Sequence, residues 1–100
     1  MKDEEYLLDI QDIRNISDAT LKKYREDLKH YTTYTEMSLD ELLKEAEEEE
    51  DNAVRKRKRK IKTHLLGFQR YLKEDLDLQD STVRSIMSRV KAFYRTYDIR

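Results

Sequence analysis

Residues 81–97 read STVRSIMSRVKAFYRTY, and this stretch decides the fold class of the chain. Its apolar residues recur at intervals of three and four, which places them on one face of a helix. Such a face is typical of a helix that packs against a core. We therefore predict an amphipathic helix over about residues 81–97. The apolar positions are Val83, Ile86, Met87, Val90, Phe93, Tyr94 and Tyr97.

Three further helices are predicted before residue 81. The first follows Ser17, a typical N-cap residue, and the second follows the capping box that Ser38 and Glu41 form. The third is predicted from an apolar stripe that begins at Val54. In order, the predicted helices cover residues 18–34, a segment from 38 that runs into the five acids of 47–51, and residues 53–74.

Residues that usually interrupt helices are scarce, since proline is absent and Gly67 is the one glycine. This scarcity argues against an all-β fold. Gly67 is either a tolerated defect in its helix or the point where a neighbouring helix approaches closely. We predict one all-α domain, a compact four-helix bundle over residues 17–97, with an amphipathic helical arm over residues 1–16 as an additional element.

Several classes of function are disfavoured. The absence of cysteine excludes disulfides, cysteine-based zinc sites and thiol catalysis. His30 and His64 lie outside metal-binding motifs, and the tyrosines on or beside apolar stripes are expected in the core. No stretch is apolar enough for a signal peptide or a membrane span. We expect no catalytic residue, metal, cofactor, small-molecule substrate or membrane partner, and a protein that stays inside the cell.

Charge is abundant and unevenly distributed. Charged residues make up 43% of the 100 residues, against about 25% in typical domains. Residues 1–51 hold 7 Lys/Arg and 17 Asp/Glu, a net charge of −10, while residues 52–100 hold 14 and 5, a net charge of +9. The overall net charge of −1 therefore conceals two halves suited to opposite partners.

A one-signed row lies on the predicted last helix. Arg84, Ser88, Lys91 and Arg95 recur at i, i+4, i+7 and i+11, which predicts one row away from the apolar stripe, and Ser85 and Arg89 widen it. No acid occurs between residues 81 and 97. Ordinary solvated faces mix both signs of charge. A face of Arg, Lys and Ser suits a phosphate backbone or a major groove, so this row indicates nucleic-acid binding.

The run Arg55–Lys60, RKRKRK, is open to two interpretations. It is either a nucleic-acid patch, or a surface that pairs locally with the acids of residues 47–51. Pairs such as Asp51 with Arg55 would form an i, i+4 ladder if the helix were continuous, and the acids would shield the run until a stronger polyanion competes.

Three segments together resemble the N-terminal core-binding domain of tyrosine recombinases, the phage-type integrases. Residues 16–28, ISDATLKKYREDL, resemble its first helix, which commonly opens S-x-x-T-x-x-x-Y-x-x-D-L. Residues 81–94 are similar to its last helix, and residues 68–72, FQRYL, to its F-x-x-Y/W-L motif. The acidic residues 37–50 are similar to those of archaeal members. Gln79 departs from the Ser or Thr that the family often has there, which leaves Asp80 as the alternative cap.

The resemblance implies a SAM-like helical bundle that clamps double-stranded DNA in a prokaryotic cytoplasm, with a homo-oligomer on the DNA as a further expectation. The catalytic residues of that family lie C-terminal to this module, so residues 98–100 would begin the linker to an absent catalytic domain. The resemblance implies that DNA contacts are made by Lys22, Lys23, Arg84, Ser85, Ser88, Arg89 and Lys91. Charge pattern adds Arg59, Lys60, Lys62, Thr63 and Arg95.

One alternative function belongs to a different class. The chain could be a helical protein-interaction module that uses its acidic half to bind a basic partner, or both halves to self-associate. Salt-sensitive dimers without DNA binding would favour this alternative.

Overall fold

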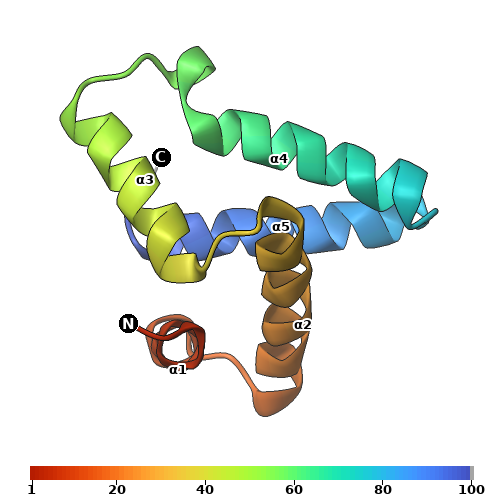
Figure 1. The fold of residues 1–100 in the computed structure, drawn as a ribbon. Helices are drawn as coiled ribbons and strands as arrows, with labels where there is room; N and C mark the ends of the chain where they lie inside the picture. Colours follow the sequence, from red (N-terminus) through yellow and green to blue (C-terminus); the bar gives the residue numbers. More distant parts are fainter. Residues whose placement is uncertain (100) are drawn as a thin grey trace.

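Helices account for about four fifths of residues 1–99, which the computed structural model describes. Figure 1 shows α5 crossing behind α2 and running beside α4 in the opposite direction. Among the described residues there is no strand, which confirms the predicted all-α class. The helices are α1 (Asp3–Arg14), α2 (Asp18–Thr35), α3 (Leu39–Asp51), α4 (Lys60–Arg70) and α5 (Asp80–Thr96); a 3-10 turn η1 (Lys56–Lys58) precedes α4, and a π-helical turn η2 (Tyr71–Asp75) follows it.

Polar caps set the starts of α2 and α3 as the sequence predicts. The Ser17 hydroxyl accepts the backbone N–H three residues on, at 3.2 Å. Ser38 and Glu41 form the complete capping box, with bonds of 3.2 and 3.0 Å. Gln79 is the N-cap of α5 without a side-chain bond, and Asp80 is the first helical residue, where its charge favours the helix dipole.

The core is built mainly on the apolar stripe of α5. Six of its seven predicted positions are buried, and Tyr97 at its end is half-buried, with its hydroxyl donating to the Tyr6 carbonyl at 3.1 Å. Tyr31 on α2 packs edge-on against Phe68 on α4, with ring centroids 5.0 Å apart. The tyrosines therefore pack in or at the edge of the core, as predicted. The largest fully buried side chains are those of Tyr31, Phe68, Phe93, Ile10, Leu28, Leu39, Leu42, Leu72, Val83 and Val90.

The predicted arm over residues 1–16 folds as α1 and packs into this core. Tyr6, Leu7 and Ile10 are buried, and the Tyr6 hydroxyl donates to Asp40 at 2.6 Å. Arg14 at the end of α1 donates to the Thr96 hydroxyl at 2.7 Å, which joins α1 to the end of α5.

The helix predicted over residues 53–74 is wrong at its start. The chain leaves α3 after Asp51, turns at Ala53 (φ 54°) and runs extended through Arg55, and α4 begins only at Lys60. Six consecutive cations would repel one another at i, i+3 and i+4 in a continuous helix. The turn instead returns the basic run toward α3, so the predicted Asp51–Arg55 ladder does not form.

Gly67 is a point of close approach, which decides between the two sequence interpretations. A Cβ atom on Gly67 would lie 2.1 Å from the hydroxyl oxygen of Tyr34 on α2. The Tyr34 ring occupies the space that a side chain would need, and it also packs against Phe68 and Tyr71. The missing side chain lets α2 and α4 meet through aromatic rings.

The end of the described chain turns back onto the bundle. After α5, the Ile99 backbone N–H donates to the Tyr94 carbonyl at 3.0 Å, and the Ile99 side chain is buried. Of the linker predicted at residues 98–100, Arg100 lies outside the described residues. Among residues 1–99, no helix is both long and apolar enough to cross a membrane.

Candidate nucleic-acid interface

The outward face of α5 carries the row that the sequence predicts. Arg84, Ser88, Lys91 and Arg95 are all exposed, each one residue past a buried position of the stripe. At 1.5 Å per residue, the row is about 16 Å long. It therefore offers three cations along one line on a rigid helix.

A second polar row on α4 faces this one. Lys62 and Gln69 on α4, and Lys73 in the turn η2 that continues it, also lie one residue past buried or half-buried apolar positions. Because α4 and α5 run side by side, the two rows border one groove (Figure 1). The sequence analysis did not identify Gln69 and Lys73. The one-residue offset from the apolar stripe is visible in the sequence, but only the packing of α4 beside α5 brings this row to the groove.

The groove has a polar section with a volume of about 430 Å³. Val83 and Met87 line it from the core side, and Asp80 is its one carboxylate. Within residues 1–99, none of the five cations of the two rows forms an ion pair with an acid of the chain. Their charges therefore remain available to an external anion. These five are Lys62, Lys73, Arg84, Lys91 and Arg95.

The other flank of α5 faces α2. Lys23 lines a hollow there with Ser81, Ser85 and Arg89, close to the acidic Asp27. The Ser85 hydroxyl donates to the Ser81 carbonyl at 3.1 Å, which leaves its oxygen free to accept. This flank is hydroxyl-rich and mixed in charge, unlike the groove beside α4.

Arg89 has a structural partner. Its guanidinium donates to Asp27 at 2.6 Å, and Asp27 is 7% exposed. Burial raises the pKa of the Asp27 carboxyl, and the Arg89 charge partly offsets that rise. Arg89 therefore ties α5 to α2 at the edge of the candidate interface.

The predicted residues around the basic run are dispersed. Arg59 turns inward, where its Nε donates to the Val54 carbonyl at 2.9 Å and its Nη1 lies 3.7 Å from Glu50. The Lys60 backbone N–H donates to Glu49 at 2.9 Å, while the Lys60 side chain is exposed. Thr63 is exposed on α4 outside the groove.

The structure thus divides the predicted residues into two groups. Around α5 it gathers Lys23, Lys62, Arg84, Ser85, Ser88, Arg89, Lys91 and Arg95. Lys22 is exposed on α2 away from the hollow that includes Lys23, and Lys60 and Thr63 lie outside the groove. Arg59 lines the groove beside Lys62, but it does not line the polar section.

His64, Tyr31 and Tyr94 each have a hydrogen-bond partner within the bundle. Residues 1–99 contain no group of three or more His, Cys, Asp or Glu side chains arranged to hold a metal. The His64 ring bonds to Glu45 at 2.8 Å and so joins α4 to α3. The hydroxyls of Tyr31 and Tyr94 bond to each other at 2.8 Å in the core, where burial raises the pKa of both. Neither phenol is placed to act as a nucleophile.

Comparison of the chain with protein-family models, curated proteins and solved structures finds no match to any of them.

Proposed function

We propose that the chain binds double-stranded DNA through the groove between α4 and α5. The observation that carries this proposal is the pair of facing rows, whose five cations have no acidic partner within residues 1–99. A polyanion would neutralise these charges without breaking any native ion pair. Phosphate contacts release condensed counterions, which supplies most of the affinity for DNA.

The side-chain types fit duplex DNA better than a small anion. A row about 16 Å long matches several successive phosphates along a duplex rather than one phosphate group. Arg84 and the neighbouring hydroxyls of Ser85 and Ser88 are exposed on the same helix, and such groups hydrogen-bond to phosphates and to base edges. The array would position a duplex with modest sequence preference.

We further infer that the chain acts as the core-binding domain of a site-specific tyrosine recombinase. The support is the order of the three sequence segments given above and a helical bundle that carries them. In this role the chain clamps DNA and contributes no catalytic group, cofactor site or small-molecule site. The chain would act in the prokaryotic cytoplasm. On DNA, it would assemble with further copies of itself.

A salt titration of duplex binding tests the DNA proposal. With five phosphates neutralised, the logarithm of the affinity should fall against the logarithm of salt concentration with a slope of about −4.5. Arg84→Ala and Lys91→Ala should each make the slope shallower by about 0.9 and weaken binding roughly five- to tenfold near 0.1 M salt.

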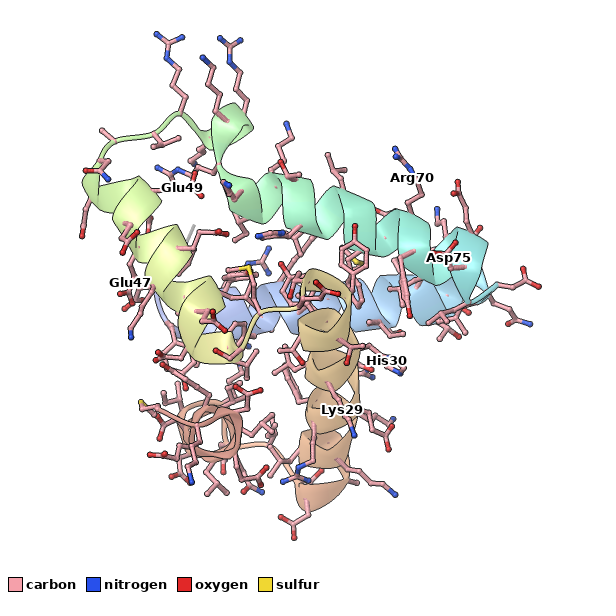
Figure 2. The ribbon with its side chains drawn as sticks, in the orientation of Figure 1. Lys29, His30, Glu47, Glu49, Arg70 and Asp75 are labelled. Carbon is pink, nitrogen blue, oxygen red and sulfur yellow. The ribbon has the colours of Figure 1, made fainter. Side chains whose placement is uncertain are left out.

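Arg70→Ala is the matched control, because Arg70 projects from α4 on the side away from α5 (Figure 2). It should change neither slope nor affinity beyond a small, non-specific loss. Failure of the unmodified chain to bind duplex at low salt would overturn the proposal. An Arg70→Ala effect as large as that of Arg84→Ala would show that the groove is not the interface.

A further inference from the structure

The loop between α3 and α4 carries a charged surface that the groove does not use. Four consecutive cations of this loop are exposed, and within residues 1–99 none of them forms an ion pair. We name them the basic turn, and Figure 2 shows long side chains of this segment standing clear of the bundle. Neighbouring like charges repel one another, so the basic turn favours an external polyanion. Its members are Arg55, Lys56, Arg57 and Lys58.

The acids of residues 47–51 do not neutralise the basic turn. Three of the five are exposed, and they form no ion pair with any described residue. The other two, Glu49 and Glu50, are half-buried and reach the base of the loop. Glu49 accepts the Lys60 backbone N–H through both carboxylate oxygens, at 2.9 and 3.2 Å, and Glu50 lies 3.7 Å from Nη1 of Arg59. These two acids therefore close the loop and leave the cations of the turn unpaired.

Further hydrogen bonds give the loop a fixed shape. The Val54 backbone N–H donates to the Glu49 carbonyl at 2.9 Å, and Nε of Arg59 donates to the Val54 carbonyl at 2.9 Å. Within the basic turn, the Lys58 backbone N–H donates to the Arg55 carbonyl at 2.8 Å. Because the backbone is already folded, binding through this turn costs less ordering entropy than binding through an extended tail.

The basic turn continues the cationic surface of the groove. A second section of the groove, about 330 Å³ in volume, is lined by Lys56 together with Lys62 and Lys91. The turn thus lies at the end of the groove where α4 begins. DNA is stiff over about 150 base pairs, so a duplex held along a row of about 16 Å continues straight past that end.

We propose that the basic turn binds phosphates of the same duplex beyond the groove, and that Glu49 and Glu50 are positioning residues that hold the turn in place. The proposal deepens the proposed function and rests on it, since the duplex in the groove brings its next phosphates to the turn. Two acids of this chain would then promote the binding of an acidic polymer. Their effect on affinity is therefore opposite in sign to that of their charge.

The salt dependence of binding to a long duplex tests the role of the turn. The five groove cations alone predict a slope of about −4.5, and four further phosphates would steepen it to about −8. Arg57→Gln with Lys58→Gln should make the slope shallower by about 1.8. The matched control is Lys29→Gln with Arg70→Gln, which removes two exposed charges from α2 and α4 away from the turn (Figure 2) and should leave the slope unchanged.

The outcomes distinguish the turn from the groove. An effect of Arg84→Ala without an effect of the turn variant overturns the role of the turn and leaves the groove proposal standing. An effect of the control as large as that of the turn variant also overturns the role of the turn. An effect of the turn variant without one of Arg84→Ala supports the turn as a DNA contact and counts against the groove. Failure of the unmodified chain to bind duplex at low salt overturns both.

Two substitutions of Glu49 test its positioning role. Glu49→Ala and Glu49→Gln remove the same charge, but the glutamine oxygen can still accept the Lys60 backbone N–H. Charge alone predicts equal and tighter binding for both variants. We expect Glu49→Ala to bind a long duplex about fivefold more weakly than Glu49→Gln, which is the effect of about one lost phosphate contact near 0.1 M salt.

The same pair in a second background separates positioning from general stability. When all four cations of the basic turn are replaced by glutamine, Glu49→Ala and Glu49→Gln should bind the duplex equally, because no charge remains to be positioned. Equal binding of the two variants in the natural background overturns the positioning role. A fivefold difference that persists without the turn cations overturns it as well, since it would then arise from the fold.

Discussion

Arg89→Ala should destabilise the fold, because Arg89 holds a buried charge. Asp27 is 7% exposed, and the Arg89 guanidinium is its ion-pair partner at 2.6 Å. Removal of one partner from a fully buried pair costs about 3–5 kcal/mol, and a hydrogen bond to a charged group contributes about 1.5–3 kcal/mol. The Arg89 side chain is 25% exposed, so water screens part of the interaction. We therefore expect a loss of about 2 kcal/mol, or roughly 10 °C in Tm for a chain of this size.

The pH dependence of this loss has a definite sign. Burial raises the pKa of Asp27 in the native state, and Arg89→Ala removes the charge that offsets the rise. A carboxyl with a raised native pKa favours the native state when it is protonated, and this contribution is lost as pH rises through the native pKa. The deficit of the variant should therefore be largest near pH 7 and shrink toward about pH 4, the usual Asp range.

Thermal melts followed by far-ultraviolet circular dichroism at both pH values measure this prediction. Arg84→Ala is the control, since Arg84 is exposed and has no ion pair within residues 1–99. The double variant Asp27→Leu, Arg89→Met should regain stability, because an apolar pair of similar size replaces the buried charges. A wild-type Tm for Arg89→Ala near pH 7, or a deficit equal at both pH values, would refute the reasoning.

Two further changes probe the helix contacts. Gly67→Ala should destabilise the chain, since its Cβ would overlap the Tyr34 hydroxyl. In a Tyr34→Phe background the loss should be smaller, because the remaining ring carbon, 3.2 Å away, needs only a small shift and helix propensity favours Ala by about 1 kcal/mol. Thermal melts of the four chains test this cycle, and equal effects in both backgrounds would contradict it. Glu49→Ala should lose about 1 kcal/mol, as for a lost helix cap, and speed hydrogen exchange in the first turn of α4 but not in α5. Glu47→Ala, on the solvent side of α3 in Figure 2, should leave both unchanged, and an equal effect would argue against the Glu49 cap.

Local signals were sufficient to predict much of the fold. The Ser17 cap and the Ser38–Glu41 capping box depend on neighbouring residues only, and both form as expected. The α5 stripe is equally local, since its buried positions follow from helical spacing. These features need no knowledge of the rest of the chain.

Features that depend on distant residues could not be predicted in the same way. The break between α3 and α4 is stabilised by Glu49, which accepts the Lys60 backbone N–H, a contact across 11 residues of sequence. The Arg89–Asp27 pair spans 62 residues of sequence. The position of Arg89 on the predicted row therefore does not reveal that its side chain pairs with a buried carboxylate. Gln69 and Lys73 join the candidate interface only because α4 runs beside α5.

The charge split explains why the α5 row remains available. The sequence places five acids only three residues before six cations, which suggests mutual neutralisation. In the fold, Glu49 and Glu50 meet the Lys60 N–H and Arg59, at the start of α4, and Asp27 meets Arg89. No acid of residues 1–99 pairs with Arg84, Lys91 or Arg95. A polyanion can therefore bind this row while every native ion pair stays intact, so binding requires no local unfolding.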